Sequence, residues 1–290
     1  NRLTQYASCT VDADAAAFDG ADSGLTDLHG HGTAMARIAV TLAVGADLVG
    51  VPVLDSKGAG SLTRVLYGLH RVAVLHTNTS RPGIVLAPLS TKTLTASQLA
   101  GGGVADLINQ AVGSLLTRNV VTVVSAGNDN LDACTVAPAS AANAITVAAL
   151  LKSTKRAKFS NWGRCADIFA PADAVTSGRS YSGTSVSAAY AAGVAATIAA
   201  GHRHASAAQV AQVLLANASQ YKVKRAQNTP PLFVHAPRRG PGVASSEALR
   251  RYKAAAVLVA SAVLSAAATV AVLGLLPPRV RRGEQEPLML

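Results

Sequence analysis

The sequence predicts an α/β fold with a mainly parallel central sheet, followed by one C-terminal transmembrane helix. The run VVTVVS at residues 120–125 is rich in β-branched residues and is typical of a buried parallel strand. Apolar, alanine-rich stretches that begin at Ala34 and at Ser185 indicate helices, the second running to about Ala200. With 290 residues, half of them hydrophobic, the chain can bury one large core.

The motif HGHGT at residues 29–33 offers a candidate general base. Gly30 and Gly32 leave His31 without flanking side chains, so we expect its ring to reach into a cleft. Thr33 is expected to cap the helix that begins at Ala34. An imidazole held in this way can accept a proton and return it near neutral pH.

Two further motifs supply the other groups that acyl transfer needs. In SGTS at residues 182–185, Ser185 opens the alanine-rich helix, so its hydroxyl is expected at a positive helix N-terminus. Asn128 follows the carboxyl end of the 120–125 strand, where open α/β sheets form their sites. We therefore predict a catalytic site of His31, Ser185 and Asn128, acting as general base, nucleophile and oxyanion donor.

These motifs, in the order His, Asn, Ser, resemble the subtilase family of serine peptidases, and in particular its proteinase K branch. The flanking segments resemble that branch in the same order: VPVLDSKGAGS (51–61), GGGVADLINQAV (101–112), SAGNDNLDACTVAPAS (125–140), FSNWGRCADIFAPA (159–172) and TPPLFVH (229–235). The resemblance covers roughly residues 1–236. It implies a subtilisin-like three-layer fold, serine endopeptidase activity and a polypeptide substrate.

The resemblance also implies a third triad residue, an Asp followed by Thr-Gly or Ser-Gly about 30 residues before the His. That spacing points to residue 1 or earlier. Asp22-Ser23-Gly24 has the right letters, but it lies nine residues before His31 and no apolar strand precedes it. We expect the triad Asp upstream of residue 1, in a chain truncated at its N-terminus. A solvated acidic loop is expected instead from the acids before the motif: Asp12, Asp14, Asp19, Asp22 and Asp27.

Several departures from the family pattern leave a second interpretation open. Arg37 stands where a Gly is usual and needs a partner, and Ala189 stands where a helix-shaping Pro is usual. The substrate-binding edge has two possible counterparts, residues 88–90 (Pro-Leu-Ser) and residues 101–103 (Gly-Gly-Gly). These departures favour a pseudoprotease that acts as a binding or regulatory ectodomain, whereas the intact catalytic motifs favour an enzyme.

Three cysteines fit an oxidising compartment. The resemblance implies a disulfide between Cys134 and Cys165, and the alternative is a pair of buried thiols. Cys9 is left over, either free or paired with a residue outside the sequence.

Charge and composition restrict the partners. The net charge is +11, but only 4% of residues are aromatic and the densest basic runs flank an apolar segment, so nucleic acid is not an expected partner. The remaining histidines show no metal-ligand spacing, and no cofactor is expected.

The last 54 residues predict a membrane anchor. Residues 254–276 hold 23 positions without a charge, enough to cross a bilayer core, and Pro277-Pro278 stops the helix. We expect a catalytic domain over 1–236, a basic linker over 237–253, this helix and a tail over 277–290; the alternative is a buried core helix. Basic residues on both sides leave the orientation undetermined. A single-pass protein of the secretory pathway or cell surface would expose the protease domain and keep the tail in the cytosol.

Overall fold

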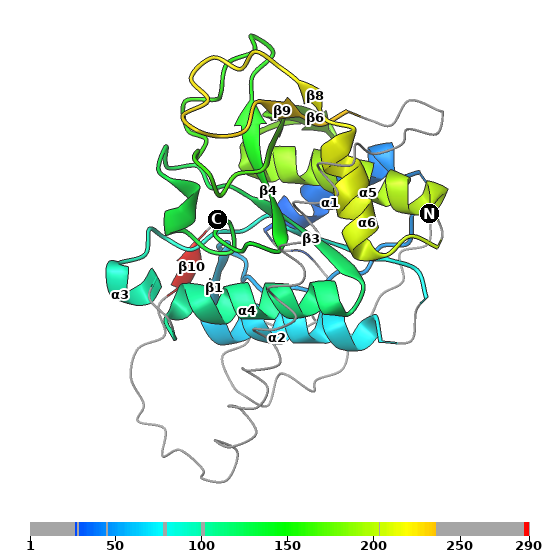
Figure 1. Ribbon diagram of the computed structural model, residues 1–290. Helices are drawn as coiled ribbons and strands as arrows, with labels where there is room; N and C mark the ends of the chain where they lie inside the picture. The colour runs from blue at the N-terminus through cyan, green and yellow to red at the C-terminus, as the bar shows by residue number, and fades with distance from the viewer. Residues whose placement is uncertain are drawn as a thin grey trace.

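In the described part of the chain, six hydrogen-bonded strands form the central sheet (Figure 1). The structure is a computed structural model that describes residues 27, 29–44, 46–77, 80–99, 102–202, 204–235 and 287–289. Asp22, Cys9, the predicted linker and the predicted transmembrane helix lie outside the described residues.

The sheet is parallel except at one edge. Every neighbouring pair runs parallel apart from β8 and β9, which pair antiparallel. Val123 stands opposite Leu86 on one side and Ile145 on the other, which fixes the register at the centre. The prediction of a mainly parallel sheet is thus confirmed. In spatial order the strands are β2 (Gly83–Ala87), β3 (Val120–Ser125), β4 (Ala144–Leu150), β5 (Ile168–Pro171), β9 (Leu232–Phe233) and β8 (Ser219–Gln220).

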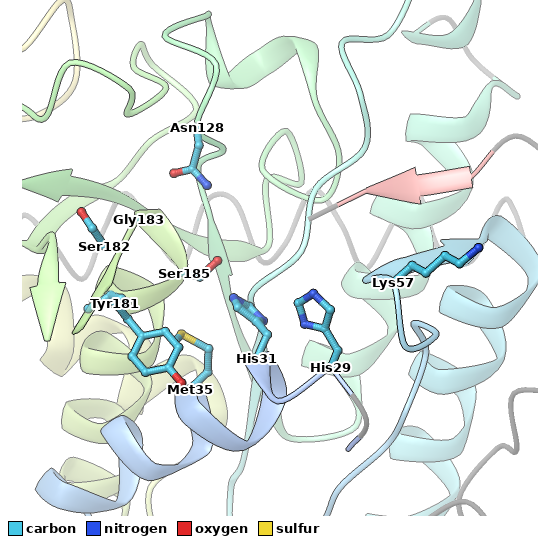
Figure 2. Close-up of a pocket in the computed structure, with 10 residues that line it drawn as sticks. His29, His31, Met35, Lys57, Asn128, Tyr181, Ser182, Gly183 and Ser185 are labelled. Carbon is cyan, nitrogen blue, oxygen red and sulfur yellow. The ribbon is translucent and has the colours of Figure 1, made fainter. Parts of the chain in front are cut away.

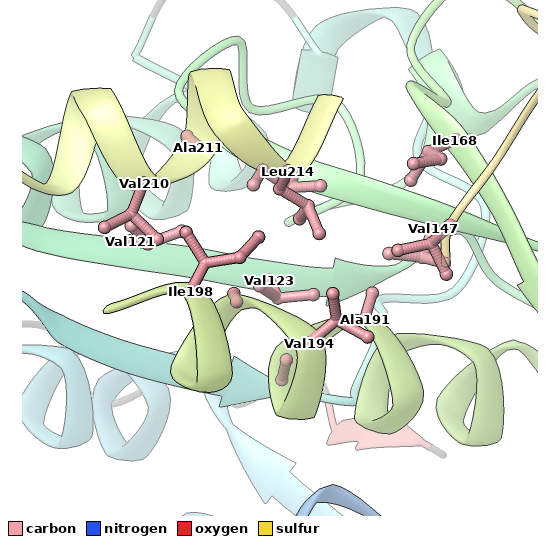
Figure 3. Close-up of a cluster of buried hydrophobic side chains, with 14 of the residues drawn as sticks. Val121, Val123, Val147, Ile168, Ala191, Val194, Ile198, Val210, Ala211 and Leu214 are labelled. Atoms are coloured by element: carbon pink, nitrogen blue, oxygen red, sulfur yellow. The ribbon is translucent and has the colours of Figure 1, made fainter. Parts of the chain in front are cut away.

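Helices cover both faces of the sheet and complete a three-layer arrangement (Figure 1). One face packs against α5 (Thr184–Gly201) and α6 (Ala207–Ala216), and α1 (His31–Leu42) lies against α5. The buried side chains of this interface include Val123, Val194 and Leu214 (Figure 3). The other face packs against α4 (Val104–Thr117), with α2 (Leu62–Leu75) beside it.

Shorter elements lie around this core. β6 (Asp173–Thr176) and β7 (Arg179–Ser182) form an antiparallel hairpin that leads into α5. β1 (Ala59–Ser61) pairs antiparallel with β10 (Pro287–Met289), with Ala59 opposite Met289. α3 (Ala96–Leu99) is one short turn, and a 3-10 turn spans Ala133–Thr135.

The helix that carries Ser185 is a core element. Among the described residues, only α5 is long and apolar enough to cross a membrane by length and composition, and 61% of it is buried inside the domain. Gly193 allows it to pack closely, because a Cβ there would lie 2.4 Å from the carbonyl oxygen of Ala39 in α1. A larger residue would push α1 away from α5.

The predicted disulfide is present. Cys134, in the 3-10 turn, is bonded to Cys165, just before β5, and their Cα atoms are 5.2 Å apart. The bond joins the loop that follows Asn128 to the strand that leads towards α5. The alternative of two buried thiols is wrong.

Candidate active site

His31 lies at the first position of α1, three residues earlier than the predicted helix start. The sequence interpretation took Thr33 as the cap, but the Asp27 carboxylate caps the helix from outside. It accepts hydrogen bonds from the backbone N–H of Gly30 (2.7 Å) and of Thr33 (2.7 Å), and from the Thr33 hydroxyl (2.8 Å). Thr33 therefore donates to the cap and is itself inside the helix, and Gly30 takes the left-handed conformation (φ 84°) that brings the chain into α1.

Asp27 is more than a member of a solvated acidic loop. Burial acts to raise its pKa, but hydrogen bonds from Thr33, Gly30 and His29 outweigh burial and hold the pKa below its usual range. A carboxylate that stays charged also stabilises α1, because it lies at the positive N-terminus of that helix. Since its hydrogen bonds go to Gly30 and Thr33, Asp27 positions the helix that carries His31 and does not orient the imidazole in the way a triad Asp does.

Ser185 lies in the first turn of α5, as predicted. Its hydroxyl donates to the carbonyl oxygen of Pro88 at 3.4 Å. This contact places Pro88, the first residue of one candidate substrate edge, beside the proposed nucleophile. In the alternative stretch 101–103, Gly101 lies outside the described residues. Gly102 and Gly103 lie directly before α4, and the Gly102 N–H donates to Asp106 in the first turn of that helix.

Asn128 is held by Thr184, a residue that the sequence interpretation missed. The Asn128 side-chain oxygen accepts from the Thr184 N–H (3.0 Å) and from the Thr184 hydroxyl (3.0 Å). The same hydroxyl accepts from the Gly127 N–H at 3.2 Å. With its oxygen held, the Asn128 amide nitrogen is left to donate to a ligand. The sequence signal for this role is a Thr directly before the proposed nucleophile. Thr184 is fully buried, and a buried hydroxyl needs hydrogen-bond partners.

A second amide supports the loop that carries Asn128. The Asn161 side-chain oxygen accepts from the N–H groups of Asp129 (3.0 Å) and Leu131 (2.9 Å). Gly127 takes the left-handed region (φ 100°) and approaches Asn161 so closely that a Cβ would lie 2.3 Å from its amide nitrogen. This loop is therefore fixed on both sides of Asn128.

All three predicted catalytic residues line one cavity of about 260 Å³ (Figure 2). His31 faces Ser185, and Asn128 lies on the opposite side of the hydroxyl (Figure 2). The rest of the lining is aromatic, apolar, cationic or small: His29, Met35, Lys57, Tyr181, Ser182, Gly183 and Val186. The cavity brings together a nucleophile, a base and an amide donor, the set that acyl transfer requires.

The surroundings of His31 favour the neutral imidazole. Burial lowers its pKa most, the neighbouring His29 lowers it further, and the charge of Asp27 acts in the opposite direction. A neutral ring can accept the proton of a serine hydroxyl at neutral pH. The pKa shift thus fits a general base.

The departures from the family pattern leave this site in place. Arg37 finds the partner it needs, because its guanidinium donates to the Ser177 hydroxyl in the β6–β7 turn. Ala189 is fully buried where α5 packs on α1, in a cluster with Met35 and Val186. α5 runs unbroken through this position.

No group of three or more His, Cys, Asp or Glu side chains in the described part of the chain could hold a metal ion.

Comparison with known proteins identifies the fold and its family. The sequence model of the subtilase family matches residues 4–236. An extracellular serine proteinase of Thermus sp. (strain Rt41A) is 37% identical over 224 residues, which cover 73% of this chain and 51% of the relative. Alkaline serine exoprotease A of Vibrio alginolyticus is 35% identical over 212 residues, covering 70% and 37%.

A solved structure shows the same architecture. The crystal structure of a cold adapted subtilisin-like serine proteinase superposes with a TM-score of 0.66 at 30% identity, covering 75% of this chain and 78% of that one. The chain spans about half or less of the length of the two curated relatives. With this fold and the match over residues 4–236, the chain belongs to the subtilase family.

Proposed function

We propose that the chain is the catalytic domain of a serine endopeptidase that hydrolyses peptide bonds in polypeptides. One observation carries this proposal: His31, Ser185 and Asn128, from three separate segments, line the same cavity. The names of the relatives, a serine proteinase and a serine exoprotease, agree with a serine peptidase.

In the proposed reaction Ser185 attacks the carbonyl carbon of the scissile bond while His31 takes the hydroxyl proton. The oxyanion that forms accepts hydrogen bonds from the Asn128 amide nitrogen and the Ser185 N–H. His31 then gives its proton to the leaving amine, and water hydrolyses the acyl-enzyme by the same steps. An Asp upstream of residue 1 is proposed as the group that orients His31.

A fluorophosphonate serine probe tests this proposal on the full-length protein. Ser185 should be labelled, and Ser185→Ala and His31→Ala should abolish both labelling and peptide turnover. If the unmutated full-length protein is not labelled, the endopeptidase proposal fails and the pseudoprotease ectodomain becomes the better interpretation.

We also propose the domain organisation expected from the sequence, with residues 254–276 as a single membrane crossing after a catalytic domain over 1–236. The 23 uncharged residues and the basic clusters at both ends support it. The confirmed disulfide and the extracellular relative support a secretory location.

The anchored form requires a change at β1. A crossing by residues 254–276 would put residues 287–289 on the opposite side of the membrane from the catalytic residues, whereas here they pair with β1. The two arrangements exclude each other. Truncation before Arg238 should release a soluble protein while the longer chain stays with membranes after carbonate washing. If both versions are soluble, the anchor proposal is wrong.

A further inference from the structure

We propose that His29 makes the cleft select substrates with a carboxylate side chain in the subsite between His31 and the turn of residues 55–58, and that this selection strengthens as the pH falls. The inference rests on the proposed endopeptidase function and names a substrate class for the same site.

His29 forms a wall of the catalytic cavity. Its ring and that of His31 meet edge to face with their centroids 6.1 Å apart, and both line the cavity (Figure 2). On its other side the His29 ring lies against Gly58, where a Cβ would come within 2.9 Å of Nε2. A substrate side chain that enters between His31 and this turn therefore meets the His29 imidazole.

The turn that faces His29 is a defined structure. The Asp55 carboxylate accepts from the N–H groups of Lys57 (2.8 Å) and Ala59 (3.0 Å), and the Gly58 N–H donates to the Asp55 carbonyl at 3.0 Å. Gly58 takes the left-handed region (φ 75°) to close it. The wall opposite His31 is thus held in place by backbone hydrogen bonds.

The described lining of the cavity contains no carboxylate to compete for a cation. Its titratable groups are His29, His31, Lys57 and Tyr181. The N-termini of α1 and α5 both point their positive ends at this cavity. An acidic substrate side chain therefore enters a cleft in which every titratable lining side chain except Tyr181 is neutral or positive.

Asp27 partly offsets this field at His31, but neither Asp27 nor Asp55 lines the cavity. Asp27 caps α1 and Asp55 caps the turn, each through backbone N–H groups. The Lys57 side chain extends away from the two imidazoles (Figure 2), so a positive charge on His29 would lie nearer the reacting groups than the charge of Lys57. An imidazole gains its charge at mildly acidic pH, so the attraction depends on pH.

The charge of His29 disfavours a second proton on His31 and lowers the pKa of that ring. The attraction between a substrate carboxylate and a charged His29 should favour Glu over Gln by about two- to fivefold, because solvent and salt screen an exposed pair of opposite charges.

Paired fluorogenic peptides that differ only by Glu or Gln at one position test this inference, with the substituted position moved step by step along the peptide. At one position the Glu/Gln ratio of kcat/KM should rise about two- to fivefold between about pH 8 and about pH 5.5. The rise should disappear in His29→Asn and persist in the matched control Lys57→Gln. Added salt should reduce it.

Equilibrium binding of the same peptides to the Ser185→Ala protein reads the preference without turnover, so it stands apart from the peptidase proposal. A failure of every Gln peptide to be cleaved refutes the peptidase proposal, while the binding ratio still tests His29. A ratio that does not change with pH at any position, or a rise that survives in His29→Asn, overturns the inference. A rise lost only in Lys57→Gln assigns the selection to Lys57 and also overturns it.

Discussion

Replacing Thr184 by Val should reduce turnover without a comparable loss of substrate binding. Thr184 holds the Asn128 side-chain oxygen through two hydrogen bonds of 3.0 Å, one from its N–H and one from its hydroxyl. Val keeps the shape and the backbone N–H but removes the hydroxyl. The Asn128 amide then loses one of the two bonds that orient its nitrogen.

The magnitude follows from the two partners of the hydroxyl. Complete loss of an oxyanion donor lowers kcat by about 10² to 10³, so a misoriented Asn128 should cost a smaller factor, about 10 to 10². The Gly127 N–H, which donates to the same hydroxyl, would be left buried without a partner, and this costs about 1–3 kcal/mol of unfolding free energy.

Steady-state kinetics and urea unfolding of the unmutated protein, Thr184→Val and Thr184→Ser separate the effect on turnover from the effect on stability. Thr184→Ser keeps the hydroxyl and should restore most of kcat, whereas Thr184→Val should lower kcat with KM nearly unchanged. A Thr184→Val enzyme with unaltered kcat would show that Asn128 does not need this hydroxyl, and a loss confined to KM would place the role of Thr184 in substrate binding.

Three other substitutions probe the fold around the site. Gly193→Val should lower the unfolding free energy by about 1–3 kcal/mol and reduce kcat, since the added side chain meets a backbone carbonyl of the helix that carries His31. The control Gly201→Ala faces open space and should change neither the unfolding free energy nor kcat. Serine at both Cys134 and Cys165 should cost about 3–4 kcal/mol in urea unfolding, given the 31-residue separation, and an unchanged midpoint would contradict this. Burial raises the pKa of Asp167 to about 7, against an ordinary value of 3.8. The folded protein therefore holds this proton more tightly than the unfolded chain, and its contribution to the unfolding free energy is fully present below about pH 4 and is lost as the pH rises through 7. Asp167→Asn should therefore flatten the fall in unfolding free energy between these values, and equal slopes in both proteins would refute the assignment.

The elements that the sequence predicted well are those whose side chains are buried on all sides. The strand at residues 120–125 and the helix that opens at Ser185 lie where their apolar composition indicated. Burial of β-branched and small residues leaves few alternative structures for such segments. The proposed catalytic residues were predicted for a different reason, because each lies within two residues of a glycine at the end of an element.

The parts that the sequence did not predict depend on polar contacts between distant segments. Asp27 caps α1 from outside the helix, so a pattern that searches for a cap directly before the apolar run finds Thr33 instead. The contact of Ser185 with Pro88 spans 97 residues and has no local signature. Thr184 and Asn128 are likewise 56 residues apart in the sequence.

The relative position of His31 and Ser185 is set by the packing of two helices, and this gives the departures from the family pattern a physical meaning. Both residues lie in the first turns of their helices, and α1 and α5 touch at Gly193 and through a cluster that contains Ala189. A small residue at 189 keeps the two helices in contact without the proline that is usual there, and α5 stays unbroken. The change therefore acts on helix packing, where it can be accommodated, and leaves the catalytic groups at the same cavity.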